Sequence, residues 1–287
     1  MNPPAVVVPR TALPQPLWKR VLDSRFMPPI FITLILLVGN FSFGILESYT
    51  RTLLAILTSI TGELILGRIF LKKWPHPASA YITGISVGIL LRSPAHWTYA
   101  LCAALSITSK YALRFRNRHI WNPSNFGICA MLFLASDSVA GLSIQWGNNF
   151  ASLLVIWILG SVIVWRAHRF NITATYVASF IALSFLRSWI TGDPWQSEIS
   201  PITGPMYQLF IFFMITDPKT TVRSRTGQYI VAVAIAVVEF FMRLGSSVYA
   251  PLYALFWVGP AALLIEMWLD SRRARALPAA LPRTQPA

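Results

Sequence analysis

The segment QLFIFFMITDPKTTVRSRTGQ (residues 208–228) begins as a hydrophobic run and stops abruptly at Asp217 and a proline. Basic residues follow at once, at Lys219, Arg223 and Arg225. Helices usually end at or before the residue that precedes a proline, and clustered basic residues mark the cytoplasmic end of a membrane helix. The segment therefore predicts a membrane helix that ends at a cytoplasmic face, and a similar pattern elsewhere in the chain indicates a repeat.

The composition places the rest of the chain in the same environment. Of its 287 residues, 55% are hydrophobic and only 12% are charged, whereas charged residues make up about a quarter of a typical soluble domain. We therefore predict an integral membrane protein whose main partner is the lipid bilayer. The net charge of +14 does not indicate nucleic acid, because the basic residues lie between hydrophobic runs, where they report membrane topology.

Metal chemistry is not expected from this chain alone. Its two cysteines, Cys102 and Cys129, both lie inside hydrophobic runs, and its four histidines lie at segment ends without ligand spacing. Zinc, haem and iron–sulfur sites need clustered Cys and His ligands. One arrangement stays open, in which each of two subunits contributes one cysteine to a shared cluster.

The hydrophobic segments predict an all-α integral membrane protein with about ten transmembrane helices. A helix needs about 20 residues to cross the hydrocarbon core. The third and eighth segments are short or interrupted by Gly and Pro. The ten segments lie near residues 29–46, 51–71, 79–93, 95–114, 121–143, 149–167, 172–190, 199–217, 226–244 and 248–268.

The basic residues support this count and orient the chain. With both termini in the cytoplasm, all but four of the 24 Lys and Arg residues fall on the cytoplasmic side. A miscounted span would reverse every later loop and destroy this bias, which is characteristic of membrane proteins. The four basic residues on the outer side are Arg51, Arg92, Arg187 and Arg243.

Four regions follow from these segments. Residues 1–27 include PLWKRVLDSRF, whose apolar side chains recur at helical spacing, which predicts an amphipathic cytoplasmic segment on the membrane surface. Residues 28–143 form a first unit of five helices, and residues 144–269 form a second. Residues 270–287 are rich in Arg, Pro and Ala, which predicts a basic cytoplasmic tail.

The two five-helix units share a pattern. YITGISVGILLRSP (81–94) and PITGPMYQLFIFFMITDP (201–218) both contain Ile-Thr-Gly, continue through a short apolar stretch and end on a polar residue and proline. Five is odd, so the two units would cross the membrane in opposite senses, as inverted repeats. Such repeats place their site near the midplane, at broken helices. The alternative is that Thr, Gly and Pro simply interrupt helices and the match is chance.

The Ile-Thr-Gly segments predict the central site. Thr83 and Gly84 begin the short third span, and Thr203 and Gly204 begin the eighth. Helix starts expose free N–H groups and the positive end of the helix dipole, which suit an anion or a polar ring. We therefore expect these four residues to face one cavity between the two spans.

Polar residues at helix ends are further candidates. Asn122 and Asn125 flank a proline at the start of the fifth span, where they could contact a ligand or cap the helix. Asp217 could bind a cation or relay a proton. Alternatively, Asp217 is an interfacial acid that Lys219 and Arg223 neutralise.

Acids inside the spans are the last candidates. Glu63 lies about midway along its span, and Arg68, five residues on, does not share its helix face. A carboxyl at that depth is costly without a partner, so Glu63 is a candidate for an ion path. Glu239 and Arg243 are four residues apart, which predicts a structural pair. The sequence indicates no catalytic residue.

NPSNFGI (122–128), FFMITDPKTT (212–221) and the paired Thr-Gly segments resemble the membrane subunits RnfD and NqrB. These subunits belong to the Rnf and sodium-pumping NADH:quinone oxidoreductase complexes, and the similarity covers roughly residues 79–268. The resemblance implies a ten-helix inverted-repeat fold in a bacterial inner membrane. It also implies flavin-associated electron transfer coupled to ion translocation, with other membrane subunits of such a complex as partners.

The resemblance also bears on the cofactor. Subunits of this family carry FMN on a threonine, in an outer loop with the pattern Asp-x-x-Ser-Gly-Ala-Thr. Asp137 and Gly141 fit this pattern, whereas Ala140, Leu142 and Ser143 depart from it. We therefore expect no covalent FMN, with Ser143 as a weak candidate, and instead a non-covalent flavin (FMN or riboflavin) near the paired Thr-Gly segments.

Two other functions stay open. The same scaffold could serve as a stand-alone transporter or channel for a small solute, without redox chemistry. The short chain also resembles UnbU-type proteins of enediyne biosynthesis, which implies an accessory membrane protein of a biosynthetic pathway. A flavin absorbance spectrum would separate the redox function from the other two.

Overall fold

The computed structural model describes residues 27–44, 46–141 and 150–276. Most of these residues are helical, and the strands among them form two sheets of only two strands each. The prediction of an all-α architecture is confirmed at this level. The predicted amphipathic segment, Ser143 and most of the predicted tail lie outside the described residues.

The first half of the chain forms five helices. Two pairs of very short antiparallel strands lie between them: β1 (Leu91–Arg92) pairs with β4 (Ala140–Gly141), and β2 (Arg114–Phe115) pairs with β3 (Arg118–His119). Ser48 caps the second helix by accepting a hydrogen bond from the Arg51 backbone N–H. The helices are α2 (Met27–Phe43), α3 (Tyr49–Leu71), α4 (Ala78–Leu90), α5 (His96–Ala112) and α6 (Pro123–Leu134).

The second half repeats this order with one element broken. Its third element is a series of short pieces, because three prolines remove backbone donors and restrict the residues before them. The final helix continues into the region predicted as a tail. The elements are α7 (Phe150–Arg166), α8 (Phe170–Thr191), α9 (Trp195–Ile199), the 3₁₀-helix η1 (Ser200–Thr203), α10 (Pro205–Leu209), the π-helix η2 (Phe210–Met214), α11 (Arg225–Leu244) and α12 (Ala250–Ala276).

Helix α3 turns its polar and small side chains toward the protein and its large apolar ones outward. Its buried residues are Thr52, Ala55, Ser59, Glu63 and Gly67. Its exposed face includes Leu53, Leu57, Ile65 and Ile69, each more than half exposed. This is the reverse of a soluble protein and suits a helix with lipid on its outer face, where small residues mediate helix packing. A lipid bilayer environment is thus supported.

Four helices are long and apolar enough to cross a membrane: α3, α8, α11 and α12. The prediction of about ten full-length spans is therefore met only in part within the described residues. Helix α4 has 13 residues and α6 has 12, which at about 1.5 Å per residue is well short of a hydrocarbon core of about 30 Å. The helices of the two halves nevertheless follow one another in the same order, with a short or broken third element in each half.

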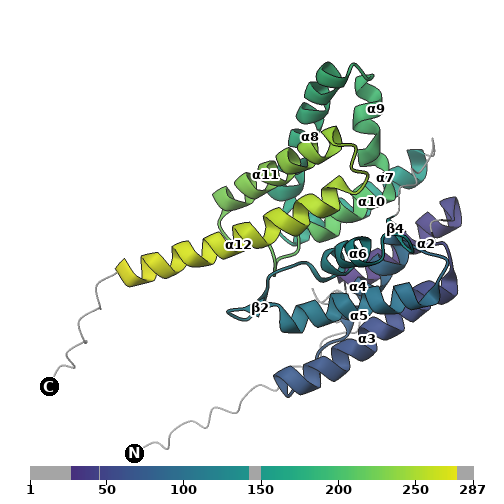
Figure 1. Cartoon of the computed structure of the whole chain (residues 1–287), viewed down its shortest axis with the longest axis vertical. Coiled ribbons are helices and arrows are strands. Elements are labelled where there is room, and N and C mark those ends of the chain that lie inside the picture. Colours follow the sequence, from purple (N-terminus) through teal and green to yellow (C-terminus); the bar gives the residue numbers. More distant parts are fainter. Residues whose placement is uncertain (1–26, 45, 142–149, 277–287) are drawn as a thin grey trace, which may run out of the picture.

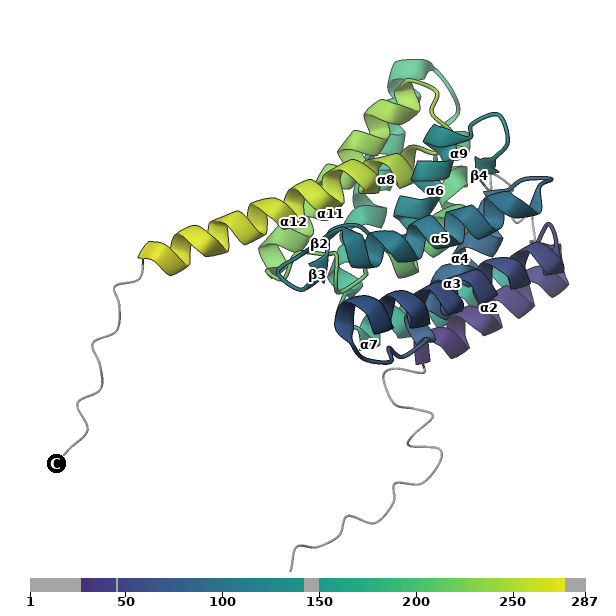
Figure 2. The same ribbon diagram turned by 60° about the horizontal axis from the view of Figure 1, so that its bottom comes forward.

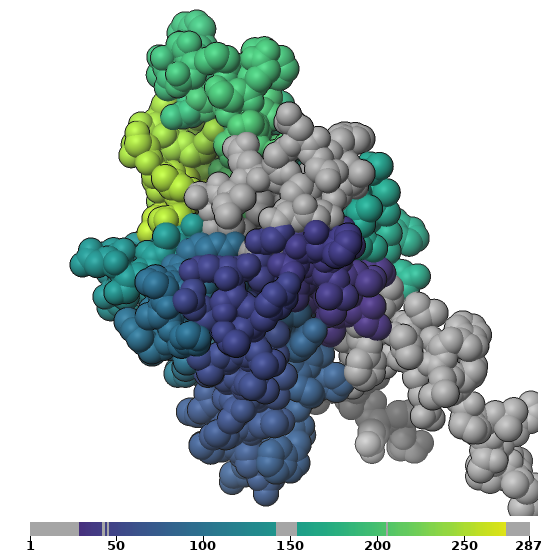
Figure 3. Space-filling model, turned by 90° about the vertical axis from the view of Figure 1, so that its right-hand side faces the viewer, coloured from purple at the N-terminus to yellow at the C-terminus, as the bar shows by residue number. Residues whose placement is uncertain are grey.

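The two halves lie side by side (Figures 1 and 2). In the first half, α3 packs on α4 and α5, and α5 packs on α6; in the second, α8 packs on α11, and α11 packs on α12. The halves meet where α2 contacts α7 and α6 contacts α12. In the space-filling view the green second half lies above the purple and blue first half (Figure 3).

Loops from both halves meet at one end of the molecule. Arg118 donates to the backbone carbonyl oxygens of Lys219, at 3.0 Å, and of Thr221, and its guanidinium lies 3.4 Å from the Glu266 carboxylate. Arg169 donates to the Val222 carbonyl oxygen at 3.2 Å. We call this end the basic face. It comprises residues 72–77, 113–122, 167–169 and 215–224 and the last turns of α12.

The remaining loops form the opposite face. Arg51 donates to the Ser93 carbonyl oxygen at 2.8 Å, and the pairing of β1 with β4 joins the loops after α4 and α6. Gly141 lies so close to Tyr249 that a Cβ atom at this glycine would be 2.7 Å from the ring. The opposite face comprises residues 44–48 (45 outside the described part), 91–95, 135–141, 192–204 and 245–249.

Candidate functional site

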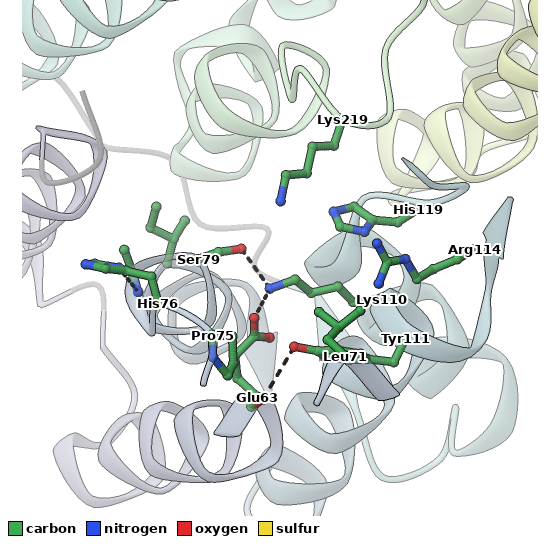
Figure 4. A pocket seen from close by; sticks show the side chains of 12 residues that line it. Glu63, Leu71, Pro75, His76, Ser79, Lys110, Tyr111, Arg114, His119 and Lys219 are labelled. Atoms are coloured by element: carbon green, nitrogen blue, oxygen red, sulfur yellow. Dashed lines mark hydrogen bonds and ion pairs between the residues drawn. The ribbon is translucent and has the colours of Figure 1, made fainter. Parts of the chain in front are cut away.

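A cavity of about 360 Å³ opens among α3, α4, α5 and the loops of the basic face (Figure 4). This volume lies at the lower end of the range for small-molecule sites, about 300–1,000 Å³. Its apolar wall is formed partly by Leu71, Pro75 and Ile82. Its polar lining includes Glu63, Ser79, Lys110, Arg114, His119 and Lys219.

A buried ion pair forms the floor of this cavity. The Lys110 Nζ atom lies 2.5 Å from Glu63 Oε1 and donates to Ser79 Oγ at 3.2 Å. Glu63 is 3% exposed and Lys110 is 6% exposed. The sequence excluded Arg68 as the partner of Glu63 but placed Lys110 among the cytoplasmic loop residues. Lys110 can reach Glu63 because it lies in the last turn of α5, and α5 packs against α3.

The cavity carries an excess of positive charge. Its lining has three cations, Lys110, Arg114 and Lys219, and one carboxylate, Glu63. No carboxylate in the described residues forms a salt bridge with Arg114 or Lys219. His119 adds no charge near neutral pH. Burial, and then the proximity of Lys219 and the other cations, lowers the pKa of His119 to about 3.

Two buried polar atoms in the lining have no hydrogen-bond partner among the described residues. They are Glu63 Oε2 and His119 Nδ1. Figure 4 shows both side chains among the residues that line the cavity. Buried polar groups are nearly always hydrogen-bonded, so these two atoms are sites at which a ligand can bind. No pattern in the sequence singles out His119, because a lone histidine in a loop is common.

Asn122 and Asp217, both predicted site residues, contact each other. The Asn122 side-chain amide donates to Asp217 Oδ2 at 3.3 Å. The Asn122 side-chain oxygen also accepts from the Asn125 backbone N–H at 3.2 Å, so the predicted helix cap is present. Asp217 Oδ1 accepts from the Lys219 backbone N–H at 3.0 Å. Burial raises the pKa of Asp217, which favours its holding a proton.

The space beside Asn122 is small. A cavity of about 20 Å³ is lined by Asn122, Thr220, Thr221 and apolar residues from both halves. That volume holds about one water molecule, and it is too small for the ring system of a flavin. Asn125 is 1% exposed, and its side-chain nitrogen has no hydrogen-bond partner within the described residues.

The first Thr-Gly pair lies inside a helix instead of at its start. Thr83 and Gly84 are the sixth and seventh residues of α4, and Thr83 Oγ1 donates to the Ser79 carbonyl oxygen at 3.0 Å. Only the first four N–H groups of a helix are free, so the expected donors at this pair are used within α4. A Cβ atom at Gly84 would lie 2.5 Å from the Ile56 Cα atom, so α3 occupies the space expected for a ligand.

The second Thr-Gly pair lies at a helix start, as predicted. Thr203 ends η1, where its hydroxyl donates to the Ser200 carbonyl oxygen at 2.7 Å, and Gly204 is the N-cap of α10. The two pairs have different neighbours, however, because α4 packs on α2, α3, α5 and α6 whereas α10 packs on α7, η1 and η2. The six predicted cofactor residues are therefore not brought together around one flavin-sized space.

Two further polar clusters lie in the second half, and the sequence missed both. Glu198 accepts from Arg187 and from Arg243, at 3.0 Å for the latter. Glu239 accepts from the hydroxyls of Tyr176 and Tyr207. The predicted pair of Glu239 and Arg243 forms no salt bridge, because Arg243 binds Glu198 of α9 and Glu239 binds Tyr176 of α8 and Tyr207 of α10; only a longer-range charge interaction links the two. Each partner comes from a distant segment, which local spacing does not reveal.

Comparison with known proteins finds no family model that matches the chain, and no curated protein matches it either. The resemblance to RnfD and NqrB therefore rests on the quoted sequence segments alone. The contact between Asn122 and Asp217 joins two of these segments across the halves.

Proposed function

We propose that this protein moves a small charged solute or ion across a membrane and binds it in the cavity beside Glu63 and Lys110. The observation that carries the proposal is the buried ion pair at the floor of a cavity that opens on the basic face. Ionisable residues within membrane helices are costly, face the protein interior and mark substrate or ion paths.

The arrangement of loops supports a transporter architecture of ten crossings in two inverted halves. Successive connections belong alternately to the basic face and to the opposite face, from the loop after α2 to the loop before α12. The contacts of α3, α5 and α6 in the first half recur for α8, α11 and α12 in the second. By the excess of Lys and Arg, the basic face and both termini would lie in the cytoplasm, as in a bacterial inner membrane.

The charge of the lining favours an anion as the solute. Lys110 is engaged by Glu63, whereas Arg114 and Lys219 form no salt bridge in the described part of the chain. A charged ligand that replaces water at such groups gains charge-assisted hydrogen bonds. Arg114 and Lys219 would thus offset part of the charge of the solute. Lys110 could leave its ion pair with Glu63 and bind the solute instead.

The test is uptake by the purified protein in lipid vesicles, followed with radiolabelled inorganic phosphate, acetate and chloride as probes. Arg114→Gln and Lys219→Gln should weaken the apparent affinity about tenfold or more, since a hydrogen bond to a charged group contributes about 1.5–3 kcal/mol. Arg116→Gln is the matched control, because Arg116 is an exposed residue of the same loop that does not line the cavity. Equal affinities for all three variants, or no uptake of any probe, would contradict the proposal.

Flavin-associated electron transfer coupled to ion translocation is the second candidate. It is favoured by the contact of Asn122 with Asp217, which joins the two segments that resemble RnfD and NqrB. The residues predicted to hold a flavin do not fit one, since α3 fills the space at Gly84 and the cavity at Asn122 is too small. A flavin absorbance spectrum of the purified protein, with co-purifying redox subunits, would favour this candidate over a stand-alone transporter.

A further inference from the structure

Glu239 is a buried carboxylate that the proposed solute site does not use. It lies on α11 and is 1% exposed. Its Oε2 atom accepts a hydrogen bond from the Tyr176 hydroxyl of α8 at 2.5 Å, and its Oε1 atom accepts one from the Tyr207 hydroxyl of α10 at 2.6 Å. Both tyrosines are buried as well, so three separate elements build this site.

No cation in the described residues forms a salt bridge with Glu239. Arg243, one turn along α11, instead donates to the carbonyl oxygen and carboxylate of Glu198, at 2.6 and 3.0 Å. Its guanidinium lies 4.7 Å from the ring centre of Phe180. Arg187 of α8 also binds the Glu198 carboxylate. The acids and arginines described on α12 lie in its second half, where Glu266 contacts Arg118 and the backbone of Arg223.

This environment suits a carboxyl group that gains and loses a proton. Two neutral hydroxyls satisfy both oxygens of an ionised carboxylate but do not cancel its charge, which is costly in a buried site. When Glu239 takes up a proton on one oxygen, it becomes a donor, and the facing tyrosine can accept because a phenol oxygen both donates and accepts. The same geometry therefore accommodates both states.

We propose that Glu239 is a proton-binding site, positioned by Tyr176 and Tyr207, in the second half of the molecule. Glu63 and Glu239 then have distinct roles in the two halves: Glu63 meets a cation at the solute cavity, and Glu239 carries a proton. Proton binding stands on the local geometry alone. Its coupling to the movement of an anion, whose charge the proton would offset, rests on the proposed function.

Infrared difference spectroscopy of the full-length protein in lipid tests the site directly. The spectrum is recorded over about pH 5 to 9, where an ordinary exposed glutamate stays ionised. We expect a protonated-carboxyl band that is lost in Glu239→Gln and shifted in Tyr207→Phe, which removes one hydrogen-bond donor. Asp217→Asn and Glu63→Gln are the matched controls, and neither should remove this component.

Each outcome decides the proposal. If Glu239→Gln leaves every carboxyl band unchanged, Glu239 keeps one charge state and the proposal is overturned. If Glu239→Gln fails to fold, Tyr176→Phe and Tyr207→Phe carry the test, and an unshifted band in both overturns the proposal.

Acidification of the vesicle interior during uptake tests the coupling of proton movement to solute movement. Uptake without proton movement refutes the coupling alone, whereas the infrared band without any uptake refutes the proposed function and leaves the proton site standing.

Discussion

Three buried glutamates are stabilised in three different ways. Glu63 meets the ammonium of Lys110, Glu198 meets the guanidinium groups of Arg187 and Arg243, and Glu239 meets two tyrosine hydroxyls. A carboxylate that leaves water loses several kcal/mol of hydration, by rough estimate, and needs such partners to remain buried. Loss of one partner should therefore cost more than the pair itself contributes.

The Glu63 pair gives a prediction of this kind. Lys110→Met should destabilise the protein by about 3–5 kcal/mol, because it leaves an uncompensated buried carboxylate. The double variant Lys110→Met with Glu63→Gln should recover most of that loss. Thermal unfolding in detergent measures both. A double variant that is no more stable than the single variant would show that the ion pair of Glu63 and Lys110 does not account for the lost stability.

His119 gives a prediction on pH. Its pKa in the folded protein, about 3, lies below its ordinary value of 6.5, so the folded protein favours neutral His119. Stability is therefore lost as the pH falls from about 6.5 toward 3, by up to about 1.4 kcal/mol per pH unit. His119→Gln should reduce this loss between about pH 7 and 5, measured by thermal unfolding. His96→Gln, at an exposed position, is the control, and equal pH slopes in all three proteins would contradict the assignment.

At the scale of the elements, the packing of α4 on α3 explains why a glycine stands in the first Thr-Gly pair. Gly84 lets α4 approach the backbone of α3, which is the role that small residues have between membrane helices. The third span is short because α4 ends at Leu90 and β1 begins at the next residue, Leu91. The eighth is broken because its prolines and Gly204 interrupt regular hydrogen bonding.

A pair of glycines tests this packing. Gly84→Ala should destabilise the protein by about 1–3 kcal/mol, because the added Cβ atom would meet the α3 backbone at 2.5 Å. Gly62→Ala is the matched control on α3, since its Cβ atom would meet Ile107 at an ordinary 3.5 Å. That variant should be neutral or more stable, by up to about 1 kcal/mol from helix propensity. Thermal unfolding of the two variants decides, and equal effects would contradict the packing argument.

The molecule as a whole has two distinct loop faces. The basic face joins the halves through Arg118, which bonds Lys219 and Thr221, whereas the opposite face joins them through Gly141 and Tyr249. In the proposed arrangement of ten crossings, both ends of the chain would lie on the side of the basic face. Several helices in the described part of the chain are shorter than a bilayer is thick, so a crossing built on them needs loops and neighbouring helices to complete the remaining depth.

Cysteine labelling in intact cells tests this topology. The native cysteines are buried, so single added cysteines report the exposed loops. Cysteines at Asp137 and Val248 should react with a membrane-impermeant reagent, and cysteines at Asn117 and Pro218 should react only after permeabilisation. All four positions are exposed in the fold. A reaction at Pro218 in intact cells would reverse the eighth crossing and exclude the inverted repeat.

The sequence alone determined the environment and the local geometry of this protein. Each hydrophobic run partitions into lipid largely by its own composition, so few charges and many apolar residues sufficed to predict membrane helices. Helix ends are also local, which is why the cap at Asn122 and the helix start at Gly204 could be predicted from nearby residues. Glu63 stood out because a carboxyl inside an apolar run is costly wherever the run packs.

Only the tertiary structure decided which charges meet. Lys110 lies 47 positions from Glu63, and Arg243 lies 45 positions from Glu198. Such partners depend on which helix faces touch, and helical spacing specifies a face without naming its neighbour. The same limit explains Gly84, whose motif suggests a ligand until α3 is seen to fill the space. The cavity exists only because three helices and three loops converge on it.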